Sequence, residues 1–112
     1  MPARIATQTF QEAGGKTAYP NLDIIGIIRK IYITSNQIPP PSSFYKGKDE
    51  RQEYIANLKR GGIYCDSEEE AYDKFAAVAE KMGYTHVFSV KMYEDDGRTI
   101  LMGDGYGPAG TA

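Results

Sequence analysis

The sequence predicts an α+β domain, in which one long amphipathic helix and one shorter helix pack on a small mixed or antiparallel sheet. Three observations support this class: helical spacing of apolar residues over 67–83, alternation over 84–93 before a hairpin signal, and a β-branched run at 22–36. With the weaker segments between them, the expected order is β-β-α-β-α-β-β. A chain of 112 residues has the size of one ordinary domain, so residues 1–112 are expected to form a single domain.

The first half of the chain contains the less regular elements. Residues 3–10 (ARIATQTF) predict a short first strand, and residues 22–36 (LDIIGIIRKIYITSN) predict a longer one that is apolar on both faces and needs cover on both sides. One face is expected to carry Ile25, Ile27, Ile31 and Ile33, and the other Ile24, Ile28 and Tyr32. Residues 49–62 (DERQEYIANLKRGG) predict the shorter helix, ending at Gly61, and GIYC at 62–65 predicts a brief strand.

The long helix is expected over residues 67–83 (SEEEAYDKFAAVAEKMG). Ser67 followed by Glu70 is a capping-box pattern, three acidic residues complement the positive helix end, and Gly83 is a typical stop. One apolar stripe is formed by Tyr72, Phe75, Ala76, Ala79 and Met82. This stripe is the face expected to pack on the sheet.

A hairpin is expected after the helix. Asp96-Gly97 favours a two-residue turn, because the primed turn types need positive φ at central positions. The resulting register places Asp95 opposite Arg98, Tyr93 opposite Ile100, and Met92 opposite Leu101, so that Arg98 is expected to neutralise Asp95.

Strict alternation along this hairpin predicts two faces. The residues expected to cover the helix stripe are Phe88, Val90, Met92 and Leu101. The opposite face carries Val87, Tyr93, Ile100 and Met102, which is more apolar than a solvated sheet face should be. Since large apolar patches usually mark interfaces, we expect the chain to form a homo-oligomer through this second face.

Composition excludes several classes of function. Hydrophobic residues at 41% and charged residues at 25% are close to globular averages, and a net charge of -2 provides no basic surface for nucleic acid. No run of about 18 apolar residues and no signal-peptide pattern occurs, so we expect neither a membrane nor a nucleic-acid partner. Cys65 is the only cysteine, which fits a reducing compartment and a cytoplasmic location.

Two motifs resemble known sites only in their letters. Tyr93-x-Asp95-Asp96 has the spelling of a polymerase metal site, yet Asp96 is expected to serve the turn, and 112 residues are too few for a polymerase. Gly105-x-Gly107-x-x-Gly110 has the spelling of a dinucleotide loop, but no helix is expected to follow it. We interpret this second motif as a flexible tail or an irregular edge segment.

The chain also resembles the YbjQ-like proteins, a family often labelled heavy-metal-binding domains. The resemblance is carried by LDIIGIIRKI, by AEKMGYTHVFSVKMY, by the hairpin and by a terminal GTA, within residues 22–36 and 67–112. It implies a compact α+β fold and symmetric, ring-like oligomers. It implies no established activity, and it transfers no ligand residue to this sequence.

Few residues suggest chemistry. Candidate metal ligands are His86, Asp95 and Asp96; a hard cation could use Asp104 with the two hairpin aspartates, and Cys65 could pair with His86 as a thiolate. A structural role is the favoured interpretation of each, so we assign no catalytic or cofactor-binding residue and expect no cofactor. The leading hypothesis is a non-enzymatic oligomeric domain that binds a partner or small ligand at a subunit interface. The alternative is a small enzyme that uses either the cysteine pair or the aspartate-bound cation.

Overall fold

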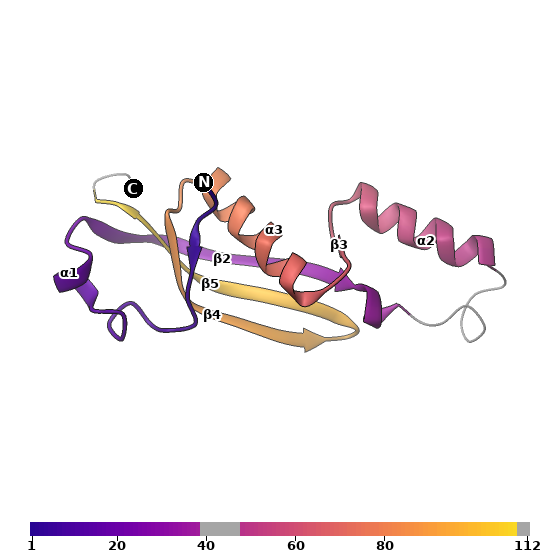
Figure 1. The fold of residues 1–112 in the computed structure, drawn as a ribbon, viewed down its shortest axis with the longest axis horizontal. Coiled ribbons are helices and arrows are strands. Elements are labelled where there is room, and N and C mark those ends of the chain that lie inside the picture. The colour runs from indigo at the N-terminus through magenta and orange to yellow at the C-terminus, as the bar shows by residue number, and fades with distance from the viewer. Residues whose placement is uncertain (39–47, 110–112) are drawn as a thin grey trace.

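The computed structural model describes residues 1–38 and 48–109 and confirms an α+β fold with a mixed five-stranded sheet (Figure 1). The elements in chain order are β1 (Arg4–Ile5), α1 (Gly15–Ala18), β2 (Leu22–Thr34), the 3-10 helix η1 (Ser35–Gln37), α2 (Lys48–Arg60), β3 (Tyr64–Cys65), α3 (Glu68–Lys81), β4 (His86–Asp95) and β5 (Arg98–Pro108). The strand order is β1-β4-β5-β2-β3; β1 is parallel to β4 and β3 is parallel to β2, whereas β5 is antiparallel to both of its neighbours. The molecule is elongated, with extents of 57 × 23 × 19 Å.

The helices differ from the expectation in number and placement. The four-residue helix α1 and the turn η1 were not predicted, and α2 with 13 residues is nearly as long as α3 with 14. Figure 1 shows α2 beyond the end of the strands rather than on the sheet. Its buried Leu58 packs there with Ile33 and Ile38, while Tyr54 is 39% exposed. The apolar side of α2 is therefore too narrow to cover a sheet face.

Helix α3 begins at the predicted N-cap Ser67 and ends at the predicted glycine, but the reciprocal bond of the expected capping box goes to Asp66 instead of Ser67. The Ser67 hydroxyl accepts a hydrogen bond from the Glu70 N–H at 3.2 Å, and the Glu70 carboxylate accepts one from the Asp66 N–H at 2.6 Å. The chain leaves the helix through Gly83, whose φ of 90° is left-handed. Both helix ends depend on contacts within a few residues, which explains why the sequence pattern indicates where the helix starts and stops.

The main core lies between α3 and one face of the sheet. Phe75 and Ala79 are fully buried against β-strand residues that include Ile28 and Leu101. The predicted packing is confirmed for Val90, Met92 and Leu101, which join this core. Met82 was assigned to the stripe incorrectly: it caps the helix and is 50% exposed.

A β-bulge at Ser89 reverses the expected faces of the β4 residues that precede it. The register passes from Phe88 opposite Asp104 to Lys91 opposite Met102, so three steps on β4 match two on β5, and Ser89 has a left-handed φ of 57°. Val87 consequently lies in the α3 core at 0% exposure, and Phe88 packs on the other face. The predictions for these two residues were wrong because they assumed an unbroken alternation.

A second irregularity lies in β2, between Ile24 and Gly26. Because of this irregularity, Ile25 packs against the α3 core together with Ile28 and Tyr32. The alternation predicted that Ile25 would share the opposite face with Ile27. Downstream of the irregularity the register with β5 runs unbroken from Ile27 to Tyr32.

The glycine motif near the C-terminus is a central strand, which corrects its interpretation as a flexible tail or edge segment. Strand β5 extends to Pro108 between β4 and β2. Gly103, Gly105 and Gly107 alternate along it and are buried, and a Cβ at Gly105 would lie 2.6 Å from a ring carbon of Tyr84. These glycines let side chains of the core approach the strand backbone closely. Gly110, the last residue of the motif, lies outside the described residues.

Among the described residues, the other face of the sheet is covered at one end only. There, an aromatic cluster forms from Phe10, Tyr19, His86, Phe88 and Tyr106. The Phe10 and Tyr106 rings stack with centroids 4.5 Å apart, and Phe88 meets both edge-on. In the part of the chain that the structure describes, no helix is long and apolar enough to cross a membrane.

Candidate functional site

Beyond the aromatic cluster, the second face of the sheet forms a surface that we call the open face. Residues directly opposite one another in an antiparallel pair share a face, so the register identifies its members. They are Ile27, Arg29 and Ile31 of β2, Lys91 and Tyr93 of β4, and Arg98, Ile100, Met102 and Asp104 of β5.

The open face exposes large apolar side chains. Ile27 is 66% exposed and Tyr93 is 40% exposed, while Ile31 and Met102 are half-buried. Ile100 lies on the same face but is only 1% exposed, because it is enclosed by its neighbours within the sheet. Of the four residues predicted to form an interface, Tyr93 and Met102 are therefore available, Ile100 is not, and Val87 is on the α3 side.

A cleft of about 400 Å³ lies next to the Ser89 bulge. Its lining residues are Thr7, Thr9, Ile27, Ser89, Lys91, Met102, Gly103 and Asp104. The N-terminal segment forms one wall and is held by the bulge, since the Ser89 N–H donates to the Gln8 carbonyl at 2.7 Å. The bulge that makes the predicted faces of β4 wrong therefore also forms part of this cleft.

Two opposite charges face the cleft without a partner. Lys91 is exposed and Asp104 is half-buried, and both line the cleft. Within residues 1–38 and 48–109, neither makes an ion pair or a side-chain hydrogen bond, with the other or with any other residue. The cleft therefore offers one cation, one carboxylate and an apolar wall.

The structure does not bring Cys65 and His86 together. Cys65 pairs with Thr34 at one end of β2, whereas His86 pairs with Tyr106, which in turn pairs with Ile24 near the other end. Thr34 and Ile24 are about 30 Å apart along the strand, at roughly 3.3 Å per residue. A thiolate–imidazole pair between these two residues is excluded within one chain.

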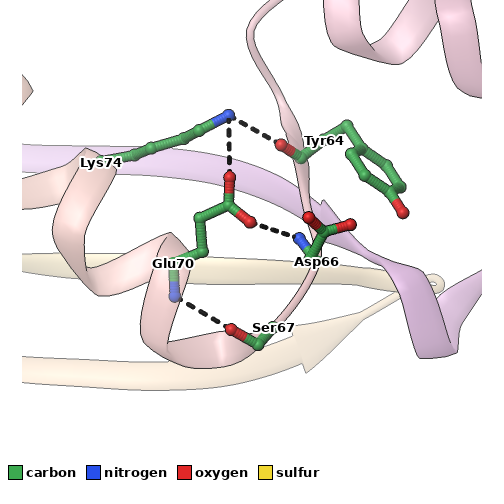
Figure 2. Close-up of polar contacts among 5 residues, drawn as sticks. All are labelled: Tyr64, Asp66, Ser67, Glu70 and Lys74. Carbon is green, nitrogen blue, oxygen red and sulfur yellow. Dashed lines mark hydrogen bonds and ion pairs between the residues drawn. The ribbon is translucent and has the colours of Figure 1, made fainter.

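The surroundings of Cys65 keep its thiol protonated. The residue is 0% exposed, and burial raises its pKa; Lys74 opposes this effect, while Glu70 and Asp66 add to it. Figure 2 shows that Lys74 is engaged elsewhere: its ammonium donates to the Tyr64 carbonyl at 2.7 Å and lies 3.9 Å from the Glu70 carboxylate. A nucleophilic cysteine needs the opposite shift and some exposure.

We expect Cys65 to react slowly with a thiol reagent in the native protein. Its raised pKa and its burial both lower the reaction rate through pH 8.5, where an unperturbed thiol is about half ionised. The measurement is the rate of reaction with Ellman's reagent from pH 6 to about 10, with the urea-unfolded chain as the control that reacts fast. Fast native labelling near pH 7 would contradict this environment.

His86 packs against aromatic rings and not against the other candidate metal ligands. Its ring stacks on Phe88 with centroids 5.8 Å apart, and the Tyr19 ring meets it edge-on at 5.2 Å. The Thr85 hydroxyl lies 2.9 Å from its Nδ1. Burial lowers the pKa of His86, and Arg4 lowers it further, so the ring is neutral at pH 7.

The candidate acidic ligands are not assembled into one site. Asp96 and Gly97 have φ values of 53° and 72°, which confirms the predicted turn, and Asp95 lies opposite Arg98 as expected. No ion pair joins Asp95 and Arg98 in the described ranges, so the expected neutralisation is not seen. Asp104 follows Arg98 by six residues on β5, which places it roughly 20 Å from the turn.

No metal centre emerges from the described part of the chain. Nowhere in residues 1–38 and 48–109 do three or more histidine, cysteine, aspartate or glutamate side chains gather in a way that could hold a metal ion. His86 is at the end of β4 opposite to Asp95 and Asp96, so the three candidate metal ligands do not form a common site.

Comparisons with known proteins do not assign the chain to a family. No family model matches the chain, and no curated protein and no solved structure shows significant similarity to it. The resemblance to the YbjQ-like family therefore stays a prediction, and the open face with its cleft is the feature from which function has to be argued.

Proposed function

We propose that the protein is a non-enzymatic domain that self-associates through its open face and holds a partner or small ligand at the subunit interface. One observation carries the proposal: α3 covers one face of the sheet, while the other face leaves Ile27 and Tyr93 exposed. The YbjQ-like resemblance, which implies symmetric oligomers, points in the same direction.

Apolar residues of the open face, some exposed and some buried, adjoin one another around Tyr93. Tyr93, Ile100 and Ile31 lie in one row across three strands, and the Tyr93 hydroxyl donates to the Met102 sulfur at 3.9 Å in the adjacent row. Single exposed apolar residues are ordinary on proteins, but contiguous ones mark contact surfaces.

A second copy of the chain is the occupant that we favour. Outside the cleft, the open face carries cations at Arg29 and Arg98, and a carboxylate at Asp95 lies opposite Arg98 at its edge. In a two-fold symmetric contact the same patch meets itself, so a surface with both signs can place cations against carboxylates. A patch of a single sign would repel its own copy.

The segment that follows β2 does not supply this cover in the described residues. Residues 48–66 pack at the end of the sheet, where Leu58 contacts Ile33 and Ile38. The sequence also allows residues 37–66 to fold over the second face and complete a monomer, but the described residues of this segment do not lie there, and residues 39–47 are outside the described part.

We expect the wild-type chain to migrate as a discrete multiple of 12.4 kDa at micromolar concentration, and Tyr93→Lys to reduce that mass. The substitution places a charge at the exposed end of the apolar row, where a docked copy would have to bury it. Size-exclusion chromatography with light scattering measures the effect. Ile100→Lys is unsuitable, because Ile100 is 1% exposed and the change would also unfold the chain.

Met82→Lys is the matched control for this experiment. Met82 is also a large exposed apolar residue, at 50%, but it lies at the end of α3 on the covered side. This variant should keep the wild-type mass. A wild-type particle of 12.4 kDa, or an equal effect of the two lysines, would overturn the proposal.

A further inference from the structure

We propose that the cleft at the Ser89 bulge binds a small zwitterion with an apolar side chain, that is, a free aliphatic α-amino acid. This inference names the ligand class for the site in the proposed function. Binding to the cleft does not itself require self-association, because all eight lining residues come from one chain.

The charges of the cleft are the first argument. Lys91 is opposite Met102, and Asp104 is two residues further along β5, so their backbones are about 8 Å apart at the usual strand spacings. The two side chains face the same cleft without pairing with each other. A ligand with its own carboxylate and ammonium complements both, whereas a simple anion or cation leaves one of them unmatched.

Hydroxyl groups add donors beside the lysine. Thr7, Thr9 and Ser89 line the cleft; the Thr9 hydroxyl is already engaged with the Glu12 N–H and carboxylate, so Thr7 and Ser89 supply the hydroxyl donors. Ser89 is held in a left-handed conformation, which is rare for a residue other than glycine and is often found at binding sites. We place the ligand carboxylate near Lys91 and these hydroxyls, and its ammonium near Asp104.

The apolar wall and the volume of the cleft define which side chain the ligand can carry. Ile27, 66% exposed, and Met102 provide the apolar side of the cleft. Its volume of about 400 Å³ is at the small end of the range for small-molecule sites. An aliphatic side chain of the size of leucine or methionine fits this combination, while a nucleotide or a long acyl chain exceeds it.

A ligand series on the unmodified chain tests the inference directly. Calorimetric titration is performed with L-leucine, with leucinamide, which lacks the carboxylate, and with 4-methylpentanoate, which lacks the ammonium. L-Leucine should bind, and each analogue should bind about tenfold more weakly or worse, because one charge in the cleft is left unpaired. Glycine, which has no side chain to cover Ile27 and Met102, should also bind more weakly.

Substitutions of the two charged residues test whether the ligand binds in the cleft. Lys91→Met and Asp104→Asn should each weaken L-leucine binding about tenfold, and Lys91→Met should abolish the preference for L-leucine over leucinamide. The matched controls are Lys30→Met and Asp73→Asn; Lys30 is exposed on the α3 side of the sheet, Asp73 is exposed on α3, and neither lines the cleft. Both controls should bind like the wild type.

Two results would overturn the inference: no saturable binding of L-leucine, L-isoleucine or L-methionine up to about 10 mM, or equal binding of L-leucine and its two analogues. The same samples are run on the light-scattering column. Binding without self-association would reject only the proposed interface, and self-association without binding would reject only the ligand.

Discussion

Replacing Phe75 with alanine is expected to lower the free energy of unfolding by about 3 to 5 kcal/mol, the usual range for a buried aromatic ring. Phe75 is 0% exposed at the centre of α3 and belongs to the cluster with Ile28, Val90 and Leu101. Removing the ring leaves a cavity between the helix and the sheet that neither can close, since both are regular elements. Urea denaturation, followed by circular dichroism, measures the change.

Met82→Ala is the control on the same helix. The side chain is 50% exposed, so its truncation should change stability by about 0.5 kcal/mol or less. If Phe75→Ala were as mild as this control, the helix would pack on the sheet differently from the structure described above.

Gly105→Ala is expected to cost about 1 to 3 kcal/mol, although alanine adds a single methyl group. A Cβ at this position would lie 2.6 Å from a ring carbon of Tyr84, a buried residue, so the ring would have to move within a packed core. Gly61→Ala is the matched control, because a Cβ there meets only atoms at 3.6 Å or beyond and its φ is not left-handed.

A double mutant separates steric crowding from other effects of the glycine. In a Tyr84→Ala background the ring is absent, so Gly105→Ala should then cost little. The difference between the two costs is the coupling energy of the pair. An unchanged cost in that background would mean that crowding by Tyr84 is not the reason for the glycine.

This result would also explain the motif Gly105-x-Gly107-x-x-Gly110 in physical terms. Its first two glycines serve the packing of Tyr84 and Ile25 against a central strand. The letters coincide with those of a phosphate-binding loop, but a phosphate loop uses glycine for the approach of a ligand, and here the approach is that of the protein's own core.

The residues of the proposed sites are only partly predictable from the sequence. Asp104 was singled out, but as a partner of the hairpin aspartates, and Tyr93 and Met102 were assigned to an exposed face. Lys91, Ser89 and the two N-terminal threonines carried no signal, because they become neighbours only when the N-terminal segment lies along β4. No spacing along the chain can show a cleft whose lining residues are up to 97 positions apart in the sequence.

What the sequence determined by itself is local: the start and end of α3, the Asp96-Gly97 turn and the hairpin register from Asp95 to Met92. Each depends on hydrogen bonds or backbone preferences within a few residues, so each leaves a readable pattern. Only the tertiary structure decided the two strand irregularities, the exposure of Met82 and the position of α2 at the end of the sheet. A bulge at a serine has no strong local signature, because it is stabilised by distant partners, here the Gln8 and Ala6 carbonyls that accept from Ser89 and Val90. One inserted step in the ladder then exchanges the faces of every residue before it, which is why Val87 became core and Phe88 turned toward the other side.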